Sequence, residues 1–211
     1  MSFFKKLFKN NQPIVIVSGL PRSGTSMLMK MLEAGGIPPL TDQIRAADDD
    51  NPKGYYEFER VKQLDKGDTA WVAEARGKAV KVISQLLRHL PADQEYRVIF
   101  MRRNMDEILA SQKKMLVNRG EDPNRVSDEE LTRLFEKHLA QVTQWLEQQP
   151  HIKTLYLHYS EVLADPRPAA DQINGFLDGR MNTQAMVASV DPTLYRNRQQ
   201  TSDFFEKSDV W

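Results

Sequence analysis

An apolar run, a loop bounded by two glycines and an apolar helical pattern follow one another near the start of the sequence. The run is Ile14–Val17, the loop is Gly19-Leu-Pro-Arg-Ser-Gly-Thr-Ser26, and the helical pattern is Met27–Leu32. A strand that enters a helix through such a loop directs backbone N–H groups and the helix N-terminus at an anion. This order of elements therefore predicts a phosphate-binding loop in an α/β fold.

The loop departs from that of an ATP-hydrolysing or kinase P-loop. The spacing G-x-x-x-x-G is present, but Thr25 follows the second glycine where such proteins have the lysine that reaches the β- and γ-phosphates. The hydroxyl of Ser26 remains, and the cation lies inside the loop as Arg22. The bound anion is therefore expected to differ from a γ-phosphate with its magnesium ion.

A second strand–turn–helix segment carries basic residues. Arg97–Arg103 has the pattern of a buried strand that ends in two arginines, and Asn104–Ser111 opens a helix. A magnesium-dependent kinase needs an acidic residue at such a strand end, whereas this chain has Arg102 and Arg103 there. A kinase is therefore the less favoured interpretation of the loop.

The two segments together resemble the sulfotransferases that use 3′-phosphoadenosine 5′-phosphosulfate (PAPS). The segment Pro21–Ser26 is similar to their 5′-phosphosulfate loop, and an Arg with a Ser eight residues later, here Arg103 and Ser111, binds the 3′-phosphate in that family. Weaker similarities extend the resemblance to about residues 13–198; they are Asn51–Glu57, Leu157–Glu161 with Asp165-Pro166, and Leu194–Arg198.

The resemblance implies roles for individual residues. Arg22 would stabilise the leaving phosphate oxygens as a fixed charge, because a guanidinium stays protonated and is a poor proton donor. Backbone and hydroxyl groups of the loop would hold the 5′-phosphate, and a basic C-terminal segment would close over the 3′-phosphate. The loop residues are Ser23, Gly24, Thr25 and Ser26, and the residues of the C-terminal segment are Arg196 and Arg198.

The residue that accepts the proton from the acceptor is less well defined. Cytosolic sulfotransferases use a histidine after a Lys-x pair on the second strand; Lys81 matches the lysine, no histidine follows at the expected place, and His89 is too far along. Other branches use a carboxylate. Glu57 is the preferred candidate, and Asp42 is the alternative.

Composition limits the other functions. The 211 residues fit one domain, and Lys plus Arg equals Asp plus Glu at 29 each, so no general affinity for nucleic acid is expected. The chain has no cysteine and its four histidines lack metal-ligand spacing, so no metal site is expected. The resemblance to sulfotransferases, not composition, implies an acceptor that is a small or carbohydrate-like molecule.

The N-terminal segment 1–12 combines lysines with four apolar residues, Phe3, Phe4, Leu7 and Phe8. It is interpreted as a frayed or locally packed tail, or as a weak contact with a membrane surface. No apolar run approaches the ~20 residues that span a bilayer. A cytoplasmic protein with the domain proper at 13–211 is the simplest expectation.

Alternating strand and helix patterns predict a single-domain P-loop type α/β fold, with three α/β/α layers around a mostly parallel sheet. Strands are expected at 14–18, 79–83, 98–101 and 154–158, and helical segments at 26–34, 57–65, 84–90, 105–117, 127–149 and 166–177. Function is expected to be sulfuryl transfer from PAPS to a hydroxyl or amine. The alternatives are a non-catalytic protein that binds PAPS or its product PAP, and a P-loop kinase.

Overall fold

The structure is a computed structural model of the 211-residue chain, and it describes residues 12–42 and 56–191. The predictions made for the N-terminal tail and for Arg196 and Arg198 fall outside these residues. So does most of the Asn51–Glu57 segment.

Four parallel strands form the central sheet. They are β1 (Ile14–Gly19), β2 (Ala79–Lys81), β3 (Tyr96–Arg102) and β4 (Ile152–His158), in the order β2-β1-β3-β4. Because all neighbours are parallel, their carboxyl ends meet at one edge of the sheet. The registers Val17↔Lys81 and Gly19↔Met101 place the loop after β1 at this edge, between the ends of β2 and β3.

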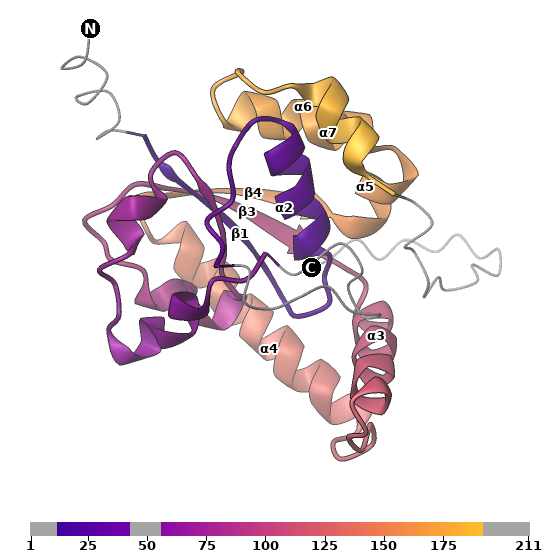
Figure 1. Cartoon of the computed structure of the whole chain (residues 1–211). Coiled ribbons are helices and arrows are strands. Elements are labelled where there is room, and N and C mark those ends of the chain that lie inside the picture. The colour runs from indigo at the N-terminus through magenta and orange to yellow at the C-terminus, as the bar shows by residue number, and fades with distance from the viewer. Residues whose placement is uncertain (1–11, 43–55, 192–211) are drawn as a thin grey trace, which may run out of the picture.

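Helices cover both faces of the sheet, which confirms the predicted three layers (Figure 1). One face carries α2 (Thr25–Ala34), α5 (Tyr159–Ala164), α6 (Pro166–Phe176) and α7 (Thr183–Ser189). The other face carries α4 (Asp128–Glu147) and three 3₁₀ helices, which are η1 (Glu59–Lys66), η2 (Val72–Ala75) and η3 (Ser84–His89). The remaining helix, α3 (Met105–Asn118), extends away from the carboxyl edge beside the start of α4 (Figure 1).

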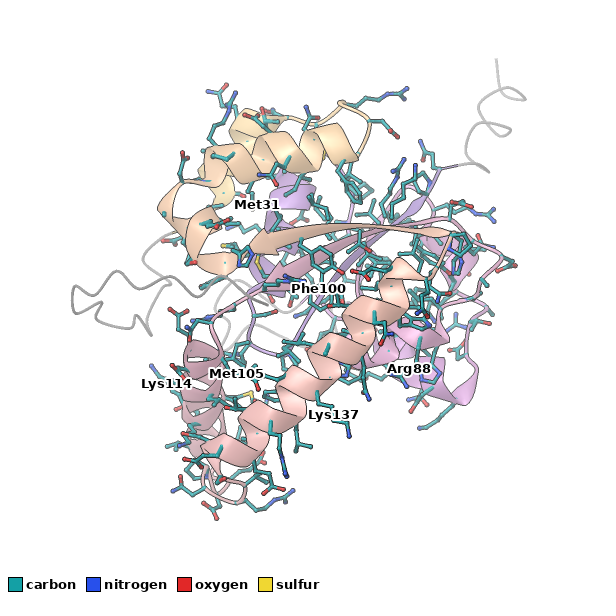
Figure 2. The ribbon with its side chains drawn as sticks, turned by 180° about the vertical axis from the view of Figure 1, so that it is seen from behind. Met31, Arg88, Phe100, Met105, Lys114 and Lys137 are labelled. Carbon is teal, nitrogen blue, oxygen red and sulfur yellow. The ribbon has the colours of Figure 1, made fainter. Side chains whose placement is uncertain are left out.

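The alternation of side chains along β3 divides the core into two clusters. Tyr96, Val98 and Phe100 pack toward α4, whereas Ile99 and Met101 pack toward α2. Figure 2 shows α4 crossing the face of the sheet that carries Phe100, with Met31 of α2 beyond the sheet. The same alternation sends Arg102 and Arg103 to opposite faces.

Capping side chains fix where the long helices begin. Ser127 caps α4, and its hydroxyl accepts the N–H of Glu130. Asn104 does the same for α3, because its side-chain oxygen accepts the N–H groups of Asp106 and Glu107. The acidic first turns of both helices complement the helix dipole.

Several predicted element bounds were wrong. Strand β2 ends at Lys81 instead of residue 83, and β3 and β4 each begin two residues before their predicted starts. The helix predicted over 57–65 is the 3₁₀ helix η1, and η2, α5 and α7 were not predicted. These short elements depend on packing against the sheet, which a local pattern does not encode. Within the described ranges, no helix is long and apolar enough to cross a membrane.

Candidate functional site

The loop between β1 and α2 forms a cradle of backbone and hydroxyl groups. Ser23 N–H closes a turn on the carbonyl of Leu20, at 3.2 Å, and Gly24 precedes the first turn of α2 with φ of 101°. The Ser23 hydroxyl is buried and has no hydrogen-bond partner among the residues that the structure describes. It lies directly over Gly19, where a Cβ would come within 2.5 Å of it. An unpaired buried hydroxyl inside a glycine cradle fits a bound anion.

Arg22 connects this loop to α3. Its Nε donates a hydrogen bond of 2.9 Å to the Ser111 hydroxyl, across 89 residues of sequence. Ser111 is buried in α3. The structure therefore brings together two residues that the sequence assigned to the 5′- and 3′-phosphate ends of one nucleotide.

Arg103 is held on three sides. Its Nε donates to Glu107 Oε2 at 2.9 Å, its Nη1 donates to the backbone carbonyl of Arg22 at 2.8 Å, and its guanidinium lies 4.3 Å from the ring centroid of Tyr159. The side chains of Arg103 and Glu107 are only 8% and 6% exposed. Among the described residues, Arg103 Nη2 has no hydrogen-bond partner.

Lys81 reaches the loop from β2. Its Nζ donates to the Ser26 hydroxyl at 3.1 Å, and its place in the sheet is level with Val17. Thr25, beside Ser26 in the first turn of α2, is buried. Cations from the loop, from β2 and from the end of β3 thus lie at the carboxyl edge of the sheet.

The two candidate carboxylates lie close to each other. The segment before Asp42 pairs with β2 through a parallel bridge between Pro39 and Ala79, so the chain leaves it toward the carboxyl end of β2. The hydroxyl of Thr41 donates to the backbone carbonyl of Glu57 at 2.8 Å, which brings Glu57 beside Asp42.

Their side-chain contacts differ. One oxygen of Asp42 accepts the N–H of Glu59 at 2.6 Å, at the first residue of η1. Glu57 Oε2 lies 3.4 Å from Lys62 Nζ and is shielded from solvent. Asp42 therefore supports the backbone of η1, whereas Glu57 contacts the half-exposed side chain of Lys62.

The sequence analysis gave no role to two residues that contact the candidate site, Glu107 and Tyr159, although Tyr159 lies within the Leu157–Glu161 segment of the resemblance. Glu107 stands four residues after Arg103, a spacing that spans the helix start and can form an ion pair. Tyr159 is 7% exposed, and a Cβ added to Gly24 would collide with its ring. Burial raises the pKa of the Tyr159 phenol, so this group is neutral at physiological pH.

No histidine stands at the position after Lys81 where the cytosolic sulfotransferases have one. Ile83, two residues after Lys81, is 41% exposed and offers no proton acceptor, and His89 ends η3. His138 of α4 shares a hydrogen bond of 2.8 Å with Ser84, and burial lowers the pKa of its imidazole. Among the described residues, no group of three His, Asp or Glu side chains is placed to hold a metal ion.

The arrangement suits an organic anion with more than one charged group. Arg22, Lys81 and Arg103 supply fixed positive charge, and the glycines let backbone approach closely. Fixed cations of this kind stabilise charge that develops on oxygen during group transfer. Arg102, on the other face of the sheet, stacks on Tyr156 at 4.2 Å and does not join them.

Comparison with known proteins gives a family match over nearly the whole chain. A sequence model described as the sulfotransferase domain matches residues 12–208. No sequence in a search of curated proteins matches the chain significantly.

Solved structures share the fold at low sequence identity. The sulfotransferase domain from the curacin biosynthetic pathway is 15% identical, with a TM-score of 0.51, over 88% of this chain and 87% of that one. Mouse sulfotransferase SULT7A1 complexed with PAP is 15% identical, with a TM-score of 0.54, over 90% and 66%. Sulfotransferase STF1 from Mycobacterium tuberculosis H37Rv is 14% identical, with a TM-score of 0.50, over 92% and 78%.

Proposed function

Because the chain belongs to the sulfotransferase family, we propose that it transfers the sulfuryl group of PAPS to a hydroxyl or amine on a small or carbohydrate-like acceptor. The observation that carries the proposal is the hydrogen-bonded convergence of Arg22, Arg103 and Ser111 at the carboxyl edge of the sheet. A nucleotide with phosphates at both its 3′ and 5′ positions could place its 5′-phosphate near Arg22 and its 3′-phosphate near Arg103 and Ser111.

The residues present fit such a nucleotide. The buried hydroxyl of Ser23 and the glycine cradle around it would receive the 5′-phosphate, with Thr25 and Ser26 at the start of α2. Arg103 and Ser111 would bind the 3′-phosphate. Arg196 and Arg198 remain candidates for closing over it. PAPS supplies an activated sulfuryl group, and the chain supplies position and charge.

Arg22 and Lys81 would act on the reacting end. Arg22 would stabilise negative charge on the leaving phosphate oxygens, and Lys81, which contacts Ser26, lies beside the same oxygens. Neither role needs a metal ion, because the sulfuryl group carries less charge than a γ-phosphate. Glu57 would take the acceptor proton, with Asp42 as the alternative base.

Binding of PAP without metal tests the donor. We expect PAP to raise the melting temperature of the full-length protein in excess chelator, because anything that binds only the folded state stabilises it. Mg-ATP serves as the matched comparison. Stabilisation by Mg-ATP but not by PAP would favour the kinase alternative and overturn the proposal.

Transfer of label from PAPS to acceptors separates an enzyme from a protein that only binds. The reaction would be followed with labelled PAPS and a panel of small hydroxylated and amino compounds. PAP binding with no transfer to any fraction of a cell extract would favour the non-catalytic alternative.

A further inference from the structure

The ion pair between Arg103 and Glu107 is the most deeply buried one among the described residues, and it lies inside the proposed 3′-phosphate site. Both side chains are less than a tenth exposed, at 8% and 6%. A buried guanidinium without a counter-charge is costly, because it has lost most of its hydration. In the empty site, Glu107 supplies that counter-charge at 2.9 Å from Arg103 Nε.

A 3′-phosphate would bring a second anion to the same guanidinium. Glu107 occupies Nε and the Arg22 carbonyl occupies Nη1, so the phosphate would meet Nη2. The carboxylate and the phosphate would then share one cation at short range, beside side chains that are less than a tenth exposed. Their repulsion raises the free energy of the occupied site relative to the empty one.

We infer that Glu107 is an internal counter-ion that neutralises Arg103 in the empty site and lowers the affinity for 3′-phosphorylated nucleotide. This inference rests on the proposed function, since it assigns the anion at Arg103. Glu107 is a positioning residue, because it acts through Arg103. The role keeps the site folded between turnovers and helps PAP to leave.

Glu107→Gln separates charge from geometry. Glutamine has nearly the same shape, and its side-chain carbonyl can still accept from Arg103 Nε, so the orientation of Arg103 is kept while the repulsion is removed. The matched control is Asp106→Asn, which removes an exposed carboxylate one residue away on the same helix turn.

Calorimetric titration with PAP and with 5′-AMP tests the inference on the full-length protein. 5′-AMP lacks only the 3′-phosphate, so the ratio of the two affinities reports on the proposed 3′-phosphate site that contains Arg103. We expect Glu107→Gln to tighten PAP binding on the order of tenfold, with 5′-AMP affinity unchanged and a lower melting temperature without nucleotide. Asp106→Asn should leave the ratio as in the wild type.

The outcomes distinguish this inference from the function on which it rests. Equal affinities of the wild type for PAP and 5′-AMP would overturn both. A wild type that prefers PAP, with an unchanged or smaller PAP:AMP ratio in Glu107→Gln, would overturn the counter-ion alone. If Glu107→Gln does not fold, Glu107→Asp is titrated instead. Its shorter carboxylate pairs less closely with Arg103, so a PAP affinity at or below that of the wild type would equally overturn the inference.

Discussion

Arg22 has a backbone φ of 70°, in the left-handed region that favours glycine. A residue with a Cβ loses about 1–2 kcal/mol there. Its backbone carbonyl accepts a hydrogen bond from Arg103 and its side-chain Nε donates one to Ser111, so both its backbone and its side chain are fixed by hydrogen bonds. The surrounding contacts thus maintain a conformation that the residue alone would not favour.

A pair of variants isolates this backbone cost. Arg22→Gly and Arg22→Ala remove the same side-chain contacts, but only alanine keeps the Cβ that disfavours φ of 70°. We expect Arg22→Gly to be about 1 kcal/mol more stable than Arg22→Ala in chemical denaturation. Equal stabilities would show that the loop relaxes out of the left-handed region when the side chain is lost.

Sulfuryl transfer by the same two variants should be strongly reduced, because both lack the guanidinium. Arg103→Ala and Ser111→Ala should chiefly weaken PAP binding, by about 1.5–3 kcal/mol for a contact with a charged group. Isothermal titration measures the affinities, and single-turnover assays measure transfer. PAP affinity that is unaffected at both positions would refute the assignment of the 3′-phosphate site.

The base assignment is tested at Glu57 and Asp42. We expect Glu57→Gln to reduce the transfer rate by ~10²–10⁴-fold, with PAP affinity within a few-fold of the wild type. Asp42→Asn keeps an oxygen that can accept the Glu59 N–H, so its effect should be smaller. Loss of activity in Asp42→Asn alone would move the base to Asp42. Full activity in both variants would exclude a carboxylate base.

The sequence analysis proposed candidate site residues that lie within motifs, and it gave no role to residues that reach the candidate site through packing. Arg22, Arg103 and Ser111 stand within local strand–turn–helix segments, and the resemblance of those segments to sulfotransferase motifs singled these residues out. Tyr159 reaches the loop only because β4 lies beside β3, which places its ring against Gly24. No local pattern reports that contact.

At the scale of elements, η3 and α4 are joined by the hydrogen bond between Ser84 and His138. Burial lowers the pKa of the His138 imidazole, so the folded protein favours its neutral form. In the unfolded chain the pKa is about 6.5. The unfolded state therefore binds more protons once the pH falls below that value, and folding stability decreases there.

His138→Gln should remove this pH dependence. We expect the free energy of unfolding of the wild type to fall more steeply from pH 7 to pH 5 than that of the variant. Urea denaturation across this range measures both slopes. Identical slopes would show that His138 is as easily protonated in the folded protein as in the unfolded chain.

Long elements were predicted better than short ones, for a physical reason. Helices α3 and α4 have caps and periodic apolar residues within their own sequence, and both were found close to their true bounds. Strand β2 has only three residues. One of them, Ala79, also forms a parallel bridge with Pro39, which lies 40 residues earlier in the sequence. Elements of that kind take their conformation from the sheet they join.

Across the whole molecule, the sheet separates a core cluster on the α4 side from one on the α2 side. Trp71 is fully buried in the first, where its indole N–H donates to the Asp68 carbonyl at 3.0 Å. Leu28 is fully buried in the second, one turn beyond Gly24, whose carbonyl accepts its N–H. Only the second cluster lies directly behind the loop.

Truncating each residue should separate stability from binding. Trp71→Ala should cost about 3–5 kcal/mol and Leu28→Ala about 2–5 kcal/mol in unfolding free energy. At a temperature where both remain folded, PAP affinity should fall in Leu28→Ala and stay within a few-fold in Trp71→Ala. Calorimetric titration measures both affinities. Equal losses of PAP affinity in the two variants would contradict the view that only the core cluster on the α2 side supports the site.

The pairing of Arg102 with Tyr156 and of Arg103 with Tyr159 has a consequence for how this protein tolerates change. Two identical cations, adjacent in sequence, are sorted to opposite faces by nothing more than the alternation of the strand. A one-residue deletion within β3 would leave an arginine available at the end of the strand but would exchange the two faces. A point substitution in β3 therefore disturbs the site less than an insertion or deletion, which would move every later side chain of the strand to the opposite face. The length of this strand, more than its composition, is the property that the site requires.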